Sequence, residues 1–142
     1  MSASALALIG YAAWTLLLVI TIITIRSWIT LVKKRESFCF KPDGSDVSKA
    51  SERMCRAHAN CVENLPIFGA IILVAIATGN SDITDSLALW VLAARVAQSV
   101  THLISISNLA ITVRVTLFSV QLAIEVWWVV QLAKIALATC CQ

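Results

Sequence analysis

The stretch ERMCRAHANCVENLPIFGAIILVAIA, residues 52–77, decides the fold of this chain. Its first part, through Pro66, is crowded with arginine, histidine, asparagine and glutamate, whereas the part from Ile67 onward is almost wholly apolar. A helix that spans a membrane needs about 20 mostly apolar residues. The stretch therefore predicts a helix that begins outside the hydrocarbon layer and carries several polar side chains into it.

The rest of the chain has the composition of an integral membrane protein. Of its 142 residues, 59% are hydrophobic and only 13% are charged, and the mean hydropathy is positive. These values lie outside the range of soluble globular domains. Four spanning helices with short connections would use nearly the whole chain, so we expect a multi-pass protein without a soluble domain.

Hydropathy and helix-end signals predict an all-α, up-and-down bundle of four transmembrane helices, forming one domain over residues 1–142. The predicted helices cover residues 5–32, 47–78, 86–106 and 110–138. Asp46 or Ser48 is placed to cap the second helix, and Gly79 is placed to end it. Asp82 or Thr84 is placed to cap the third helix.

Charge is distributed unevenly along the connections. Eight of the 11 lysines and arginines lie between Arg26 and Arg56, including the cluster Lys33–Arg35. The connection between the second and third helices carries Asp82 and Asp85 and no cation. Because positively charged loops stay on the cytoplasmic side, we expect the first loop to face the cytoplasm and both termini to face the opposite side.

The cysteines and tryptophans predict no cofactor site by themselves. The five cysteines form no CxxC pair and have no matching histidine pair, so neither a disulfide framework nor a metal site is expected. The tryptophans are expected at the membrane interfaces or facing lipid. They are Trp14, Trp28, Trp90, Trp127 and Trp128. The basic residues lie along a membrane boundary with no soluble domain to present them, so nucleic-acid binding is not expected.

Polar side chains inside the predicted spans mark the candidate site. A charge at the bilayer centre costs at least about 2.5–3.5 kcal/mol, so such residues usually face the interior of the bundle. Pro66 removes a backbone hydrogen bond and is expected to tilt the second helix beside the mouth of a cavity. Five polar residues from three helices fall at one level in the cytoplasmic half: Arg56, Asn60, Glu63, His102 and Arg114.

Arg95 and Glu125 are predicted to lie deeper in the bilayer. At a rise of about 1.5 Å per residue, Arg95 lies about 12 Å from the outer end of the third helix, and Glu125 is expected at a similar depth on the fourth. Opposite charges at one depth predict a buried ion pair, because an unpaired buried charge would be strongly destabilising. An ion pathway through Arg95, Glu125 and His102 is disfavoured, because the polar groups form no stripe across both leaflets.

A pocket formed at the level of the five polar residues would favour a small anion that also bears an amine. Cations dominate its rim, while Glu63 and Asn60 supply an acceptor and an amide. A peptide-like molecule with carboxylates has this chemistry, and a lateral opening to lipid would admit a lipophilic second substrate. If the ligand carries a thiol, the guanidinium of Arg114 would favour its thiolate and activate it as a nucleophile.

Several segments resemble the MAPEG family, the membrane-associated proteins in eicosanoid and glutathione metabolism. The segment ERMCRAHANCVENLPIF is similar to the family's second-helix signature, with its E-R, R-A-H, N and E-N-x-P pattern. AARVAQSVTH resembles the third-helix arginine segment, and ITVRVTLF resembles the fourth-helix segment with its catalytic arginine. The four-helix layout agrees along essentially the whole chain.

The resemblance implies a homotrimer with glutathione bound between neighbouring subunits on the cytoplasmic side. Carried over by position, the polar residues of the second helix would hold the glutathione backbone, and Arg114 would lie beside the thiol. The basic residue that the family's first helix contributes corresponds to Arg26 or to one of Lys33–Arg35. The candidate glutathione-binding residues are Arg26, Arg56, Asn60, Glu63 and Arg95.

Two departures from the family pattern concern the reaction. Members that resemble prostaglandin E synthase carry a tyrosine seven residues after the third-helix arginine, where this chain has His102. They also carry an arginine directly after the R-A-H triplet of the second helix, where this chain has Ala59. The only tyrosine, Tyr11, lies in the first helix at the wrong depth. His102 would replace the phenol as a hydrogen-bond donor or act as a base. Alternatively, the site binds its ligand without catalysis.

The retained polar residues favour an integral membrane glutathione transferase, with peroxidase activity left open. It would add the thiolate of glutathione to lipophilic electrophiles drawn from the bilayer, with Arg114 and His102 as the candidate catalytic residues. The alternative is a non-catalytic lipid-binding scaffold protein of the same family, which the missing tyrosine favours.

Overall fold

The computed structural model describes residues 1–32 and 39–140, with side chains described through residue 138. It contains four helices: α1 (Ala3–Val32), α2 (Lys49–Ala77), α3 (Asp82–Ile104) and α4 (Asn108–Cys140). Each is long and apolar enough to cross a membrane. Since no strand occurs among the described residues, the predicted all-α fold of four spanning helices is confirmed. The predicted basic cluster Lys33–Arg35 lies outside the described residues.

The two ends of α2 follow from local backbone chemistry. The hydroxyl oxygen of Ser48 accepts the N–H of Ser51 at 3.0 Å, so Ser48 is the cap, as one of the two predicted alternatives. Gly79, with φ at 72°, follows the last turn, and this left-handed conformation is the one that glycine adopts most readily. Between these ends the helix continues through Pro66.

The start of α3 differs from the prediction. The helix begins at Asp82 instead of residue 86, and Ser81 occupies the N-cap position. Neither Asp82 nor Thr84 is therefore the cap. Thr84 and Asp85 are engaged with α1 instead. Thr84 Oγ1 lies 2.6 Å from Ser4 Oγ, and Asp85 Oδ1 accepts the Ser4 N–H at 2.8 Å. These bonds fix the beginning of α1 against the beginning of α3.

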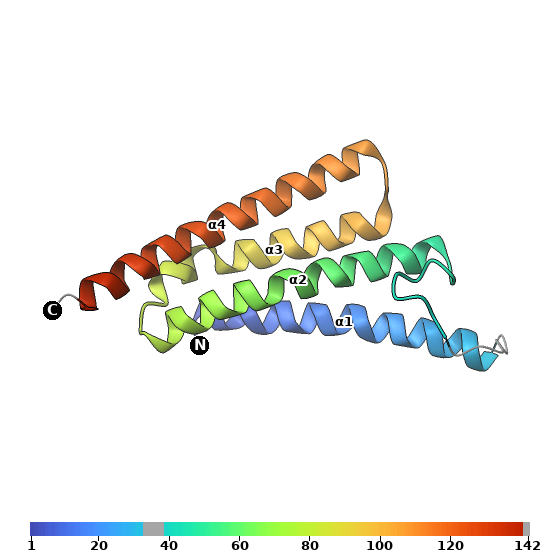
Figure 1. Cartoon of the computed structure of the whole chain (residues 1–142), viewed down its shortest axis with the longest axis horizontal. Coiled ribbons are helices and arrows are strands. Elements are labelled where there is room, and N and C mark those ends of the chain that lie inside the picture. The colour runs from blue at the N-terminus through green and yellow to red at the C-terminus, as the bar shows by residue number, and fades with distance from the viewer. Residues whose placement is uncertain (33–38, 141–142) are drawn as a thin grey trace.

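The four helices run up and down side by side (Figure 1). Both termini and the α2–α3 turn lie at one end, here called the termini end, and the two other connections lie at the opposite end, here called the loop end. α1, α2 and α3 pack against one another, whereas α4 packs on α3 and, to a smaller extent, on α2. Figure 1 shows α4 diverging from α3 toward the loop end.

Three aromatic rings in tilted contact, here called the aromatic stack, lie in the middle of the bundle. The Phe68 ring centroid is 5.3 Å from that of Tyr11 and 6.2 Å from that of Trp128, which joins α1, α2 and α4. Trp128 is fully buried, so its predicted place at an interface or facing lipid is wrong. It lies on the same face of α4 as the buried Glu125 and Gln121, and that face points into the bundle.

Much of the apolar surface is exposed in the single chain. Large apolar side chains such as Leu16, Leu73 and Trp90 are exposed on different helices. α4 is the least covered, since its described buried residues are only Ala110, Gln121, Glu125 and Trp128. Apolar surface of this extent is suited to lipid or to other protein subunits and not to water.

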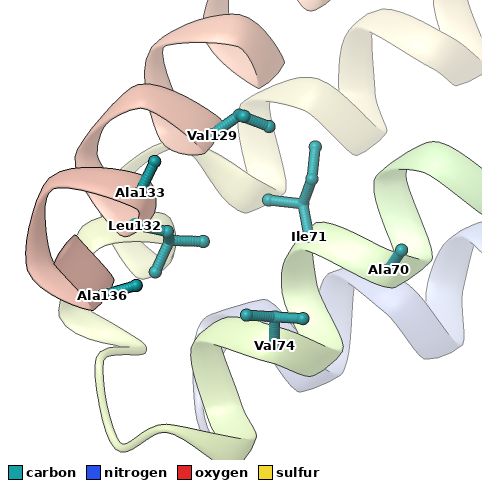
Figure 2. Close-up of a pocket in the computed structure, with 7 residues that line it drawn as sticks. All are labelled: Ala70, Ile71, Val74, Val129, Leu132, Ala133 and Ala136. Carbon is teal, nitrogen blue, oxygen red and sulfur yellow. The ribbon is translucent and has the colours of Figure 1, made fainter. Parts of the chain in front are cut away.

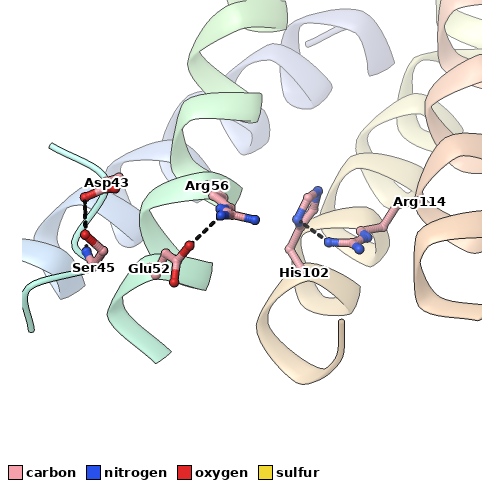
Figure 3. Close-up of polar contacts among 6 residues, drawn as sticks. All are labelled: Asp43, Ser45, Glu52, Arg56, His102 and Arg114. Carbon is pink, nitrogen blue, oxygen red and sulfur yellow. Dashed lines mark hydrogen bonds and ion pairs between the residues drawn. The ribbon is translucent and has the colours of Figure 1, made fainter. Parts of the chain in front are cut away.

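The described part of the α1–α2 loop folds onto the first turns of α2. The Gly44 N–H donates to the Lys41 carbonyl at 3.0 Å, and Gly44 is buried with φ at 68°. Asp43 Oδ1 accepts hydrogen bonds from the N–H (3.1 Å) and the hydroxyl (2.9 Å) of Ser45 (Figure 3). These bonds hold the pKa of Asp43 below its ordinary value, because they favour the carboxylate.

Candidate functional site

A polar pocket of about 330 Å³ opens between α2, α3 and α4 near the loop end. It brings together Asn60, His102 and Arg114, three of the five residues that the sequence places at one level. Each comes from a different helix, and all three lie within or beside the segments that would cross the membrane. The pocket is lined by Asn60, Gln98, His102, Ile111, Arg114, Val115 and Phe118.

His102 and Arg114 form a hydrogen-bonded pair in the wall of this pocket. Their atoms Nδ1 and Nη1 are 2.8 Å apart (Figure 3). A guanidinium carries donors only, so Arg114 donates and Nδ1 of His102 accepts. The imidazole is then neutral, with its proton on Nε2, and it can offer a ligand a hydrogen-bond donor. Of the two roles considered for His102, this geometry favours the donor over the base.

Arg56 lies in a neighbouring hollow. Its guanidinium forms an ion pair with Glu52, one turn earlier on α2, and its side chain is 65% exposed. In Figure 3 it extends from α2 on the side of the His102–Arg114 pair. Together with Lys49 and Arg53 it gives this hollow a positive rim at the loop end.

Glu63 lies outside the pocket, on an exposed face of α2. It is two turns from Arg56 on the same side of the helix, whereas Asn60 is turned toward α3. The packing of α1, α3 and α4 leaves this face of α2 uncovered. The exposed residues along it are Arg56, Ala59, Glu63, Pro66 and Ala70. A carboxylate on this face within a spanning helix needs a polar partner, because lipid offers none.

Arg26 lies on α1, apart from the pocket. Its Nη2 donates to the Lys41 carbonyl at 3.0 Å, and its guanidinium carbon lies 5.5 Å from the centroid of the Phe40 ring. The same Nη2 is 3.8 Å from Cys55 Sγ. In the single chain, Arg26 therefore ties the α1–α2 loop to α1 and α2.

The predicted direct ion pair between Arg95 and Glu125 is wrong. Both residues are buried, as expected, but Arg95 Nη1 donates to Asn60 Oδ1, and Glu125 Oε1 accepts from Asn64 Nδ2 at 2.8 Å. Two asparagines one turn apart on α2 thus separate the charges.

A third bond, from Gln121 Nε2 to Gln98 Oε1 at 3.2 Å, joins α3 to α4. Each of the three helices therefore supplies two side chains, and each bond joins a different pair of helices. We call this set the polar ring: Asn60, Asn64, Arg95, Gln98, Gln121 and Glu125. Two of its members, Asn60 and Gln98, also line the pocket.

A second cavity, of about 350 Å³, lies between α2 and α4 toward the termini end. Figure 2 shows its walls, which carry only aliphatic side chains: Ala70, Ile71, Val74, Val129, Leu132, Ala133 and Ala136. The bond between Asn64 and Glu125 and the stack of Phe68 on Trp128 lie between this apolar groove and the polar pocket. The groove thus shares no lining residue with the polar pocket.

Several residues of the site have no predicted role in the sequence. Phe118 lines the pocket one turn after Arg114, and Gln121 and Asn64 complete the polar ring. Helical spacing was the available signal, since Asn64 follows Asn60 by four residues and Gln121 follows Arg114 by seven. The partner of each polar side chain depends on helix rotation, which spacing along one helix does not determine.

Comparison with known proteins gives one finding. A family model described as the MAPEG family matches residues 4–134, which is nearly the whole chain. No curated protein and no solved structure gives a significant match.

Proposed function

The chain belongs to the MAPEG family, and we propose that it is a membrane-bound glutathione transferase. Glutathione would bind in the polar pocket between α2, α3 and α4. The observation that carries the proposal is the His102–Arg114 pair beside Asn60 in one pocket. This places a fixed cation, a neutral donor and an amide where spanning helices meet, and a family concerned with glutathione supplies the ligand.

The pocket has the groups needed to stabilise a thiolate. Arg114 is held in place by its bonds to His102 and to the Ala110 carbonyl, the latter at 3.2 Å from Nε. Its remaining N–H groups and the Nε2–H of His102 would point donors at the sulfur. The thiol proton leaves to solvent, and the sulfur forms a bond to an electrophilic carbon of a lipophilic substrate. At the same time that carbon either releases a leaving group with its bonding electrons or passes a π electron pair to the substrate, which then takes a proton from solvent. Peroxidase activity would start from the same thiolate.

A neighbouring copy of the chain would complete the site. Arg56 and Glu63 lie on the uncovered face of α2, where lipid would offer a carboxylate no polar partner. In a homotrimer this face would be covered, and both side chains would reach the part of the glutathione molecule that extends from the pocket to the subunit interface. The excess of cations in the first loop supports a cytoplasmic loop end.

The test is glutathione binding and conjugation of a model electrophile by the purified protein in detergent. We expect Arg114→Ala to retain part of the binding while turnover falls by about 100-fold or more, as when a donor to a developing anion is removed. Lys134→Ala is the matched control, because Lys134 is an exposed cation of the same helix far from the pocket. Unchanged binding and turnover in Arg114→Ala would remove Arg114 from the mechanism.

A lipid-binding scaffold protein is the second candidate. The apolar groove, of about 350 Å³, favours it, as does the burial of the only tyrosine, whose hydroxyl donates to the Cys61 carbonyl at 3.2 Å and is not available to a thiol. A scaffold would retain co-purified lipid, bind no glutathione and conjugate no electrophile. Saturable glutathione binding by the wild type would exclude this function as the sole one.

A further inference from the structure

Among the described residues, Arg95 and Glu125 are the two charged side chains that are buried in the bundle, and their charges are opposite. Their exposed fractions are 0% and 2%. An arginine stays protonated under all ordinary conditions, so its charge inside a membrane requires a counter-charge. Glu125 is the buried carboxyl group in the described residues that can supply it.

The polar ring leaves both charges partly unpaired. Nε and Nη2 of Arg95 and Oε2 of Glu125 are buried and make no hydrogen bond. The two groups interact electrostatically across the ring without touching. Because no direct contact neutralises either charge, the field of each extends beyond the ring, in a region where the low dielectric screens it weakly.

Arg95 lies directly beneath the polar pocket. Its Nη1 donates to Asn60, and its guanidinium carbon is 5.7 Å from the centroid of the Phe118 ring. Asn60 and Phe118 are both pocket walls. Glu125 is seven residues beyond Phe118 on α4, which places it about 10 Å farther from the pocket along the helix. A ligand in the pocket is therefore nearer to the cation than to its counter-charge.

On the premise of the proposed function, we propose that Glu125 moderates the positive potential of Arg95 at the pocket and thereby sets how much bound glutathione is thiolate. Glu125 touches no ligand and is a positioning residue. Its effect on the ligand comes from its charge, which partly offsets the charge of Arg95. Removing its charge leaves Arg95 uncompensated, which stabilises a nearby anion. Removing the charge of Arg95 has the opposite effect.

Other ionisable groups from every helix surround Arg95, Glu125 and the pocket. These side chains are the same in all the variants described below. They are Tyr11 of α1, Arg56 and Cys61 of α2, His102 of α3 and Arg114 of α4. A shift between variants therefore reports the changed charge.

The experiment is a pH titration of the thiolate absorbance of glutathione bound to the full-length protein in detergent. At an effective dielectric constant of about 20 and a separation of about 15 Å, the charge of Glu125 changes the thiolate-to-thiol ratio by about sixfold. We expect Glu125→Gln to raise the ratio about sixfold and Arg95→Gln, whose charge is nearer to the ligand, to lower it by a larger factor. In the double variant the ratio should be higher than in Arg95→Gln and lower than in the wild type, because the nearer charge is removed as well as the more distant one. Glu125→Asp, which keeps the charge, should behave as the wild type.

Either single variant tests the proposal by itself, so the test remains possible if the other variant does not fold. A purely structural role would change the yield or the thermal stability and leave the titration midpoint in place. Equal midpoints in the wild type and in either folded single variant, with glutathione bound, would overturn the proposal while leaving the proposed function intact. Absence of glutathione binding by the wild type would overturn both.

Discussion

Asn64 and Glu125 form the hydrogen bond that holds α2 to α4 in the middle of the bundle. Asn64 Nδ2 donates to Glu125 Oε1 at 2.8 Å, and the Phe68–Trp128 stack follows one turn farther along both helices. On one side of this contact lies the polar pocket, and on the other lies the apolar groove. The contact therefore divides the space between α2 and α4 into two chemically different parts.

Neutralising Glu125 alone should destabilise the protein more than removing both buried charges. In Glu125→Gln the Arg95 guanidinium stays buried without a counter-charge, a situation that typically costs about 3–5 kcal/mol. The double variant Arg95→Gln/Glu125→Gln has no unpaired charge and should recover much of this loss. Equilibrium unfolding in mixed micelles measures both, and equal losses would show that the two charges do not compensate each other.

The aromatic stack should contribute more to stability than any exposed tryptophan. Trp128→Ala removes a fully buried side chain and leaves a cavity, for which a loss of about 3–5 kcal/mol is expected. Trp90→Ala is the control, since Trp90 is 72% exposed. Similar unfolding midpoints for the two variants would mean that α4 does not pack on Phe68 in the membrane.

His102 should act as a donor and not as a base. Its Nδ1 accepts from Arg114, so only Nε2–H is left for a ligand. His102→Gln retains an N–H donor and should keep turnover within about tenfold of the wild type, whereas His102→Leu should lose about 100-fold. His58→Gln, on α2 and outside the pocket lining, is the control. Equal losses in His102→Gln and His102→Leu would assign His102 the role of base.

Glu63→Gln should weaken glutathione binding more than it changes folding. The side chain is exposed in the single chain, so neutralising it breaks no internal contact. A charge-assisted hydrogen bond to the ligand's amine is typically worth about 1.5–3 kcal/mol, which corresponds to roughly a 10- to 150-fold weaker affinity. Asp82→Asn, an exposed acid at the termini end, serves as the control. Unchanged affinity would make Glu63 a residue of the subunit contact only.

The fold was readable from the sequence because hydropathy and helix-end chemistry act locally. Ser48 and Gly79 mark the ends of α2 by interactions within a few residues. Interactions of this kind can be recognised from neighbouring residues in the sequence. The start of α3 was read incorrectly because Thr84 and Asp85 bond to Ser4, about 80 residues earlier. No local pattern contains that contact.

The sequence predicts how deep each polar side chain lies in the membrane, but it does not predict which side chains bond to one another. Depth along a helix follows from residue number, so Asn60, His102 and Arg114 were placed at one level, where they share a pocket. Rotation about each helix axis decides which groups meet, and it depends on the packing of all four helices. Arg95 and Glu125 show this, since they lie buried as expected while asparagines of α2 occupy the positions between them.

The α1–α2 loop should depend on Gly44 through space as well as through backbone conformation. Gly44 and Gly79 both have a positive φ, 68° and 72°, so alanine at either position adopts a left-handed conformation that costs about 1–2 kcal/mol. A Cβ on Gly44 would also lie 2.7 Å from Ser51 Oγ and 3.1 Å from the Ser51 carbonyl, whereas one on Gly79 would meet nothing within 4 Å. We expect Gly44→Ala to expose the loop to limited proteolysis and Gly79→Ala to leave its cleavage rate near that of the wild type. The extra effect at Gly44 arises because the loop must move off the first turns of α2, and equal cleavage rates in the two variants would show that the loop does not pack there.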